Sequence, residues 1–243
     1  MFAKLQHFLN SLAERQERIF LSILVGLFLS LYSPINLIAG SWSAGSAETA
    51  LDRAIPFIPA WVYIYALLYV LLPLPLVLPS PRPAFRRICA SFAFTSLVSF
   101  VVFVLFPVHM DLRPTDLDTT EFASWLLALI HRVDTPANCL PSLHVSLSLL
   151  AALCAWSLDR AVGRIAIPLA LVVAFSTLLV KQHWVWDMFT GWALGFSVWV
   201  VFVRGKTGER LPVARRGVHF LLVGLVLLFG VARAVHALEW FPL

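Results

Sequence analysis

Long apolar runs separated by short polar stretches dominate the chain, and they predict membrane-spanning helices. A run of about 20 apolar residues is the length that crosses a bilayer as an α-helix. We predict seven such spans, at residues 19–39, 57–79, 88–108, 141–157, 163–181, 187–203 and 217–237. The second run contains Pro73, Pro75 and Pro79, so we expect its end to be kinked or irregular.

The first 18 residues follow a different pattern, in which apolar positions alternate with charged ones. Phe2, Leu5, Leu9 and Leu12 are spaced as on one face of a helix, which predicts an amphipathic helix lying in the membrane interface. No short apolar region ends in a small-residue cleavage site, so we do not expect a cleavable signal. The expected domains are this cytoplasmic helix (1–18), a membrane domain (19–203), and a cytoplasmic basic loop with the seventh span (204–243).

The composition excludes a soluble domain. Apolar residues make up 60% of the chain and charged residues 13%, with a mean hydropathy of +0.87. Soluble domains have about 45–50% apolar and about 25% charged residues. We therefore expect an all-α, polytopic membrane helix bundle, and no nucleic-acid module despite the net charge of +5. Three cysteines are too few, and odd in number, for a disulfide scaffold.

The basic residues are unevenly distributed between the two sides of the predicted bundle. Of the 18 lysines and arginines, only Arg53, Arg113, Arg132, Lys181 and Arg233 fall on the side away from the N-terminus. The positive-inside rule then places the N-terminus in the cytoplasm and the C-terminus outside a plasma or inner membrane. The basic excess also suits contact with the anionic headgroups of membrane lipids.

The acidic residues and histidines gather on the opposite, outer side. The long connection 109–140 carries many of them and includes a predicted short helix near 121–132. A loop of this length is either functional or merely solvated. We favour function, because the next two segments bring Asp187, His144 and His183 to the same face.

His183 and Asp187 are the first candidate pair for chemistry. A spacing of four residues places two side chains on one face of a helix. A carboxylate that accepts from one imidazole nitrogen leaves the other nitrogen as a nucleophile or base. The alternative is that the two side chains merely satisfy each other on a helix, but ionisable residues at a membrane boundary more often have a functional role.

A second group surrounds the predicted start of the fourth span. Pro141 and Ser142 suit the first turn of a helix, and the helix N-terminus near His144 favours a bound anion. Ser142 either donates to that anion or simply caps the helix. Arg113 and Lys181 suit phosphate oxygens, although either can instead be an interfacial anchor.

Together these residues form a site for phosphoryl transfer without a metal. One histidine attacks phosphorus, a carboxylate orients it, a second histidine protonates the leaving alcohol, and cations bind the oxygens. A metal site fits less well, because the sequence has no His-Glu-x-x-His and the cations would repel a divalent ion. Trp184 and Trp186 flank the site as interface anchors or headgroup contacts.

These residues resemble the motifs of the type 2 phosphatidic acid phosphatase (PAP2) superfamily of membrane lipid phosphatases and phosphotransferases. The family motifs are Lys-x6-Arg-Pro, Pro-Ser-Gly-His and Ser-Arg-x5-His-x3-Asp. The second resembles Pro141-Ser142-Leu143-His144, and the third resembles the stretch from Ser176-Thr177 through His183 to Asp187. The resemblance covers roughly residues 90–200, and the Pro-Ser-Leu-His form is closest to the inositol phosphorylceramide synthase-like branch.

The resemblance implies a PAP2-like six-helix core, here with one extra C-terminal span, and it assigns roles to residues. His183 is the implied nucleophile, Asp187 its partner and His144 the acid. Arg113, Ser142 and Ser176 are the implied phosphate contacts. Two family cations are missing, since Phe106 replaces the lysine of the first motif and Thr177 the arginine of the third. We expect Lys181, one turn after Thr177, to replace that arginine.

The function expected from this resemblance is a membrane phosphatase acting on a phospholipid or isoprenyl (pyro)phosphate through a phosphohistidine, with no cofactor. Two alternatives stay open: a lipid phosphotransferase that moves a headgroup, and a non-catalytic lipid transporter or binding protein. Hydrolase and transferase share the same catalytic residues and differ in the second nucleophile, so the motifs do not separate them. The expected partners are the lipid-phosphate substrate and membrane lipids.

Overall fold

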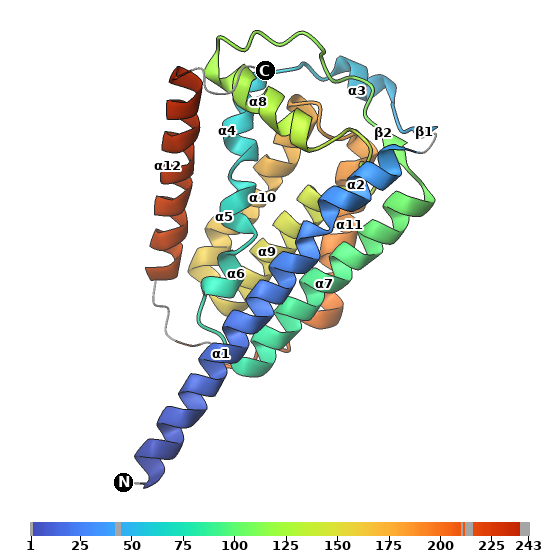
Figure 1. The fold of residues 1–243 in the computed structure, drawn as a ribbon. Coiled ribbons are helices and arrows are strands. Elements are labelled where there is room, and N and C mark those ends of the chain that lie inside the picture. The colour runs from blue at the N-terminus through green and yellow to red at the C-terminus, as the bar shows by residue number, and fades with distance from the viewer. Residues whose placement is uncertain (1, 42–44, 210, 212–215, 239–243) are drawn as a thin grey trace.

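Helix α9 (Leu143–Leu158) lies at the centre of a bundle of helices in the computed structural model of the protein (Figure 1). The structure describes residues 2–41, 45–209, 211 and 216–238; in α1 it describes the side chains of Gln6 and of residue 10 onward. The elements, in chain order, are α1 (Phe2–Ser30), α2 (Tyr32–Gly40), β1 (Gly45–Ser46), α3 (Ala50–Ala54), η1 (Pro59–Trp61), α4 (Val62–Tyr65), α5 (Leu68–Leu71), α6 (Leu74–Val77), α7 (Arg82–Leu105), β2 (Val108–His109), α8 (Phe122–Val133), α9, α10 (Arg160–Leu179), α11 (Val185–Phe202) and α12 (Arg216–Ala237).

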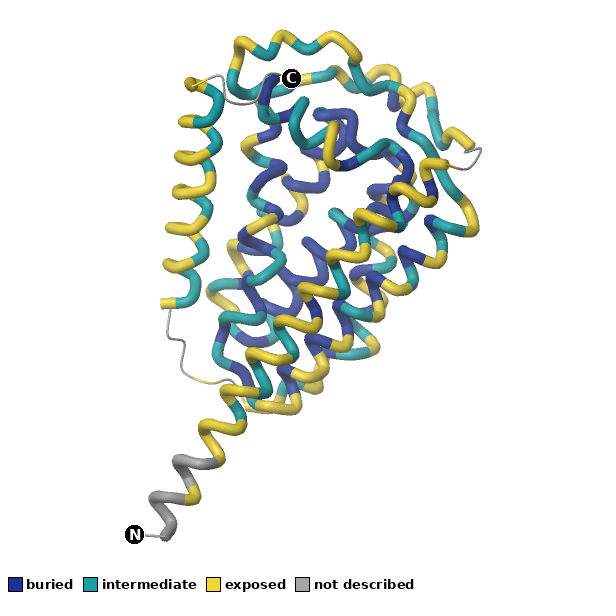
Figure 2. Tube along the Cα trace, viewed as in Figure 1, coloured by how far each residue is buried: buried dark blue, intermediate teal, exposed yellow. Residues whose placement is uncertain are grey.

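The described part of the chain is mostly helical, with almost no strand, and is suited to a membrane. Six segments are long and apolar enough to cross one: Asn10–Gly40, Pro59–Val77, Arg82–Leu105, Arg160–Leu179, Val185–Phe202 and Arg216–Ala237. The span that we predicted at 141–157 is α9, which has only 16 residues. It is apolar on every side, and most of it is buried between α10 and α11 (Figure 2). The prediction of an all-α, polytopic membrane bundle is thus confirmed.

The second predicted span is irregular along much of its length. Residues 59–77 form a turn of 3₁₀-helix followed by three four-residue helices, α4, α5 and α6. Pro73 and Pro75 lie at the last of these breaks, as expected from the missing N–H of proline. The irregularity begins earlier than predicted, at Ala66 and Leu67, where no proline is present.

Helix α1 runs without interruption through residue 18, where we expected the interfacial helix to end. No proline or glycine precedes Gly26, so the sequence provides no break there. The side chains of Phe2, Leu5 and Leu9 lie outside the described set, so the expected amphipathic face stays a prediction. Glu17 pairs with Arg82 and Arg86, which fastens α1 to the start of α7.

The loops that matter for function lie at the other end of the bundle from the N-terminus (Figure 1). The predicted helix near 121–132 is α8, which lies at this end and buries Trp125 and Leu127. Strands β1 and β2 form one short parallel pair, which brings residues 45–46 beside 108–109.

Candidate active site

Two histidines from distant parts of the chain meet at this end of the bundle. Nδ1 of His144, in the first turn of α9, lies 2.9 Å from Nε2 of His183, in the loop between α10 and α11. The structure therefore brings the second and third sequence motifs together. The ring of His144 is held between Tyr32 and Tyr65, with ring centroids 5.9 and 5.5 Å away.

Asp187 contacts the other nitrogen of His183. Its Oδ2 lies 3.3 Å from His183 Nδ1 and accepts a 2.8 Å hydrogen bond from the Trp184 N–H. The expected contact is present, but the two residues do not lie on one face of a helix, because α11 begins only at Val185, after His183. Asp187 instead caps the first turn of α11, and His183 precedes that cap.

The chain reverses sharply after α10 to place His183. The Gln182 N–H donates to the Thr177 carbonyl (2.8 Å) and the Lys181 N–H to the Leu178 carbonyl (3.2 Å), as in a Schellman motif. Lys181 occupies the left-handed position of this motif, with φ 54°, where glycine is usual. The Thr177 carbonyl also accepts from the His183 N–H at 3.3 Å. This turn therefore fixes the backbone of the proposed nucleophile.

Asp134 is a site residue that the sequence analysis did not single out. Its Oδ2 lies 3.7 Å from His144 Nε2 and accepts from Gln182. Its Oδ1 accepts from the Tyr32 hydroxyl at 2.7 Å and from the Asn36 amide at 3.0 Å. A buried carboxylate with this many donors is a fixed acceptor for the second histidine. Asp134 is one of nine acids on the predicted outer side, and no motif or spacing distinguishes it.

Arg113 joins the backbone segments around the two histidines. Its Nη1 donates to the Asp134 carbonyl at 2.6 Å, and its Nε donates to the Lys181 carbonyl at 3.4 Å. A guanidinium has five N–H donors, so these contacts leave others for an anion. Arg113 thus lies beside Asp134 and the His183 loop, and its role as a phosphate-binding cation stays a prediction.

Lys181 contacts the backbone of residues 52–55, and its expected role in place of the missing arginine stays a prediction. Its Nζ donates to the carbonyls of Asp52 (2.8 Å) and Ile55 (2.7 Å). The Asp52 side chain in turn accepts from the Val185 N–H at 2.8 Å. The ammonium therefore ties the His183 loop to residues 52–55, and only its third N–H is left for another acceptor. Asp52 was not among the predicted site residues, although Thr49 and Asp52 have the spacing of a capping box.

The two serines assigned by the resemblance are both buried. Ser142 is the N-cap of α9 and accepts from the Val145 N–H at 3.2 Å, so the capping alternative is present in the structure. Its own hydroxyl proton is still available as a donor. Ser176 donates to the Val173 carbonyl of its own helix at 2.6 Å.

The two tryptophans of the third motif occupy different environments. Trp184 is fully buried, and its indole donates to the His109 carbonyl at 2.8 Å. The prediction that it lies at the interface or contacts a headgroup is therefore wrong, because this hydrogen bond satisfies the indole inside the fold. Trp186, by contrast, is 57% exposed.

Burial determines the protonation of His183. Removal from water lowers the pKa of His183 to about 4, with a smaller effect of the same sign from Arg113, while Asp134 opposes the shift. His183 is therefore a neutral base near pH 7. Because Nδ1–H faces Asp187, the lone pair is on Nε2, and the 2.9 Å contact requires a proton on His144 Nδ1.

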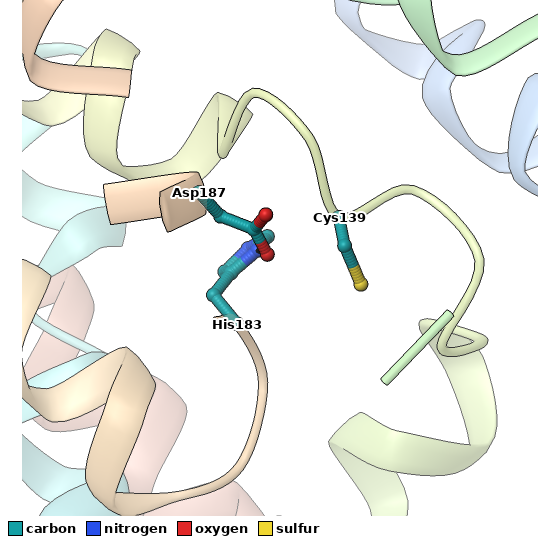
Figure 3. A group of neighbouring side chains, drawn as sticks. All are labelled: Cys139, His183 and Asp187. Carbon is teal, nitrogen blue, oxygen red and sulfur yellow. Dashed lines mark hydrogen bonds and ion pairs between the residues drawn. The ribbon is translucent and has the colours of Figure 1, made fainter. Parts of the chain in front are cut away.

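Cys139 completes a group of three potential metal donors. Donor atoms of Cys139, His183 and Asp187 lie within 4.8 Å of one another. Cys139 comes from the loop before α9, whereas His183 and Asp187 come from the stretch where α11 begins (Figure 3). A thiolate, an imidazole and a carboxylate suit zinc. However, Asp187 Oδ2 already binds the Trp184 N–H and faces His183, so in this arrangement the carboxylate serves the histidine.

An apolar cavity of about 580 Å³ adjoins the histidine pair. His144 and Asp134 line one part of it, and most of the remaining lining is aliphatic or aromatic. The walls come from α1, α2, α4, α5, α8, α9 and α12. The volume lies in the range of about 300–1,000 Å³ that is typical of ligand sites.

Comparison with known proteins agrees with these observations. The sequence profile of the PAP2 superfamily matches residues 60–211, which is more than half of the chain and includes Arg113, both histidines, Asp134 and Asp187. No curated protein and no solved structure matched the chain. The match identifies no branch within the family. On the strength of this match, and of the histidine pair that the fold assembles, the chain belongs to the PAP2 superfamily.

Proposed function

We propose that the protein is a membrane lipid-phosphate phosphatase that works through a phosphohistidine on His183. The observation that carries the proposal is the continuous contact from Asp187 through His183 to His144, next to an apolar cavity. PAP2 members act as phosphatases or phosphotransferases, and this arrangement supplies a nucleophile and an acid for either reaction. We choose the phosphatase because water is the simplest second nucleophile.

In the first step, the lone pair of His183 Nε2 attacks phosphorus. The bond from phosphorus to the lipid oxygen breaks, and that oxygen takes a proton from His144. Asp187 stabilises the positive charge that develops on the His183 ring. The phosphoryl group must enter between the two rings, so the 2.9 Å contact between them opens when substrate binds.

In the second step, water attacks the phosphohistidine and His144 takes a proton from that water. The phosphorus–nitrogen bond breaks, its electron pair returns to Nε2, and inorganic phosphate leaves. Asp134 contributes to both steps, because a carboxylate near Nε2 stabilises the protonated form of His144. Asp134 thus orients His144 as Asp187 orients His183.

The phosphate oxygens are bound mainly by Arg113 in this proposal. The guanidinium lies next to the His183 loop and keeps N–H donors beyond those used on carbonyls. Ser142 contributes its hydroxyl proton at the N-terminus of α9, where helix N–H groups favour an anion. Ser176 completes the set through the family resemblance. Lys181, with one remaining donor, is included as the expected replacement of the missing arginine.

The charge distribution along the sequence supports an outer-face active site. The site lies at the end of the bundle away from the N-terminus, whereas α7 begins at the other end (Figure 1). Arg82 and Arg86 belong to this start of α7. The positive-inside rule assigns that basic end to the cytoplasm. In this orientation the lipid phosphate enters from the outer leaflet.

The test is a substrate panel with purified protein in lipid nanodiscs and mass spectrometric detection of products. We expect inorganic phosphate to be released from phosphatidate or an isoprenyl pyrophosphate without any added alcohol. His183→Ala should abolish this release, whereas the exposed His219→Ala in α12 should leave it unchanged. A phosphoryl group trapped on His183 supports the mechanism directly.

Three outcomes would contradict the proposal. Product formed only when an alcohol acceptor is added would indicate a phosphotransferase. Binding of lipid phosphates without turnover would indicate a transport or binding protein. Full activity of His183→Ala would overturn the assignment of the nucleophile.

A further inference from the structure

Helix α12 forms one wall of the apolar cavity, although it lies beyond the part of the chain that matches the family. The family match ends at residue 211, and α12 begins at Arg216. Leu228, Phe229 and Ala232 of α12 line the cavity. None of the residues of α12 is buried, and Figure 1 places the helix at the outside of the bundle, along α4 and α5.

The two ends of α12 are fastened to the bundle. Near its start, a Cβ added to Gly217 would lie 2.9 Å from the Val77 carbonyl oxygen, so glycine permits a close approach to α6. Near its end, His236 Nε2 lies 3.1 Å from the Thr119 carbonyl, and the guanidinium of Arg233 lies 5.1 Å from the ring centroid of Phe122. The cavity-lining residues lie between these attachments.

The cavity is continuous with the catalytic residues. His144 and Asp134 belong to its lining, and the His144 ring contacts His183 directly. The rest of the lining is mainly aliphatic and aromatic, with tyrosines near the catalytic end. A ligand that reaches from His183 into this space therefore needs a phosphate at one end and an apolar body at the other.

We infer that the cavity binds the hydrocarbon chain of the lipid phosphate, and that α12 sets which chains fit. The inference rests on the proposed function, since it names the part of the substrate that the cavity receives. A phosphate at His183 leaves its ester oxygen toward His144, and the chain then extends into the space between α5, α8 and α12. Ala232 is the smallest lining residue on α12, so a larger side chain at this position fills the cavity.

The test compares Ala232→Trp with Ala234→Trp, a neighbouring exposed position of α12 that does not line the cavity. The substrates are hexadecyl phosphate and butyl phosphate, in lipid nanodiscs. We expect Ala232→Trp to lower kcat/KM for hexadecyl phosphate by about tenfold or more, because each methylene kept out of an apolar site costs about fourfold in affinity. Turnover of butyl phosphate by the same variant should stay within about twofold of wild type.

An equal loss on both substrates, or no loss on the long one, would overturn the inference. Failure of the proposed function is distinguishable, because then the wild-type protein releases no phosphate from either substrate.

Binding provides a readout that does not need catalysis. A hexadecyl phosphate with a diazirine at its methyl end should label α12 or α8 in His183→Ala, and Ala232→Trp should abolish that labelling. Labelling that is unchanged by Ala232→Trp would place the chain elsewhere.

Discussion

The carboxylate of Asp134 lies 3.7 Å from Nε2 of His144, whose Nδ1 lies 2.9 Å from His183. The second histidine thus has its own carboxylate, as the first has Asp187. Two carboxylate–histidine pairs therefore face each other through the short contact between the rings. This arrangement gives the proposed nucleophile, His183, and the proposed acid, His144, a separate carboxylate partner each.

Replacing Asp134 with asparagine should weaken general acid catalysis more than nucleophilic attack. We expect Asp134→Asn to lower turnover of an alkyl phosphate by roughly ten- to a hundredfold, within the range for loss of an acid–base catalyst. An aryl phosphate with an activated leaving group, which needs little protonation, should lose much less. Tyr32→Phe is the matched control, since it removes one donor to Asp134 and keeps the carboxylate. Equal losses on both substrates would assign Asp134 a purely structural role.

Arg113 and Lys181 should differ in their effects on phosphate affinity. We expect Arg113→Ala to weaken inhibition by vanadate by about tenfold or more, because a charge-assisted contact to the anion is lost. Lys181→Ala should weaken it less and should mainly lower the melting temperature, because Lys181 uses two donors on Asp52 and Ile55. If Lys181→Ala weakens vanadate inhibition as much as Arg113→Ala does, Lys181 is the replacement for the missing arginine.

Chelation tests the donor group of Cys139, His183 and Asp187. If Asp187 serves His183, incubation with EDTA should leave phosphate release unchanged within about twofold, and added Zn²⁺ should inhibit by occupying His183. Cys139→Ala should relieve that inhibition while keeping activity. Loss of activity with EDTA and its recovery with Zn²⁺ would instead identify a zinc enzyme.

Local sequence rules predicted most of the helices but not how one site residue is held. The apolar runs predicted the positions of the helices, because membrane spans have a length and composition that are readable locally. The spacing of His183 and Asp187 predicted their contact, yet the contact comes from a helix cap. No local signal distinguishes the cap from a pair on one helical face, because both have a spacing of four.

Asp134 shows what local rules miss. Its partners Tyr32 and Asn36 are about a hundred residues away in sequence, so only the tertiary fold brings them together. Trp184 shows the same limitation, because local rules predicted a position that the fold does not give it. Its position at a predicted boundary indicated the interface, but the His109 carbonyl holds it inside. Pairings at such sequence separations depend on the packing of the whole bundle.

The protonation of His183 can be measured directly. Since burial lowers the pKa of His183 to about 4, the ring should still be neutral at about pH 5.5, below the usual histidine value of about 6.5. The unfolded chain then binds the proton more tightly than the folded protein. The unfolding free energy should therefore fall as the pH decreases from about 6.5 toward 4. Nitrogen NMR of labelled histidine, with His183→Gln to assign the signal, checks this. A midpoint near 6.5 would contradict the buried, neutral nucleophile.

The close contact between α9 and α11 should make Gly195 indispensable. A Cβ added there would lie 2.4 Å from the Ser146 carbonyl oxygen, which is backbone and can move only with its helix. We expect Gly195→Ala to cost about 1–3 kcal/mol of stability, as for other overpacked positions. Because α9 carries His144 and α11 carries Asp187, the shift should also slow phosphorylation of His183. Gly224→Ala in α12 is the control, since a Cβ there meets no atom within 4 Å and alanine favours the helix. Thermal unfolding in detergent and the rate of phosphohistidine formation measure the two effects. A Gly195→Ala protein as stable and as active as Gly224→Ala would show that this packing does not hold the catalytic residues in place.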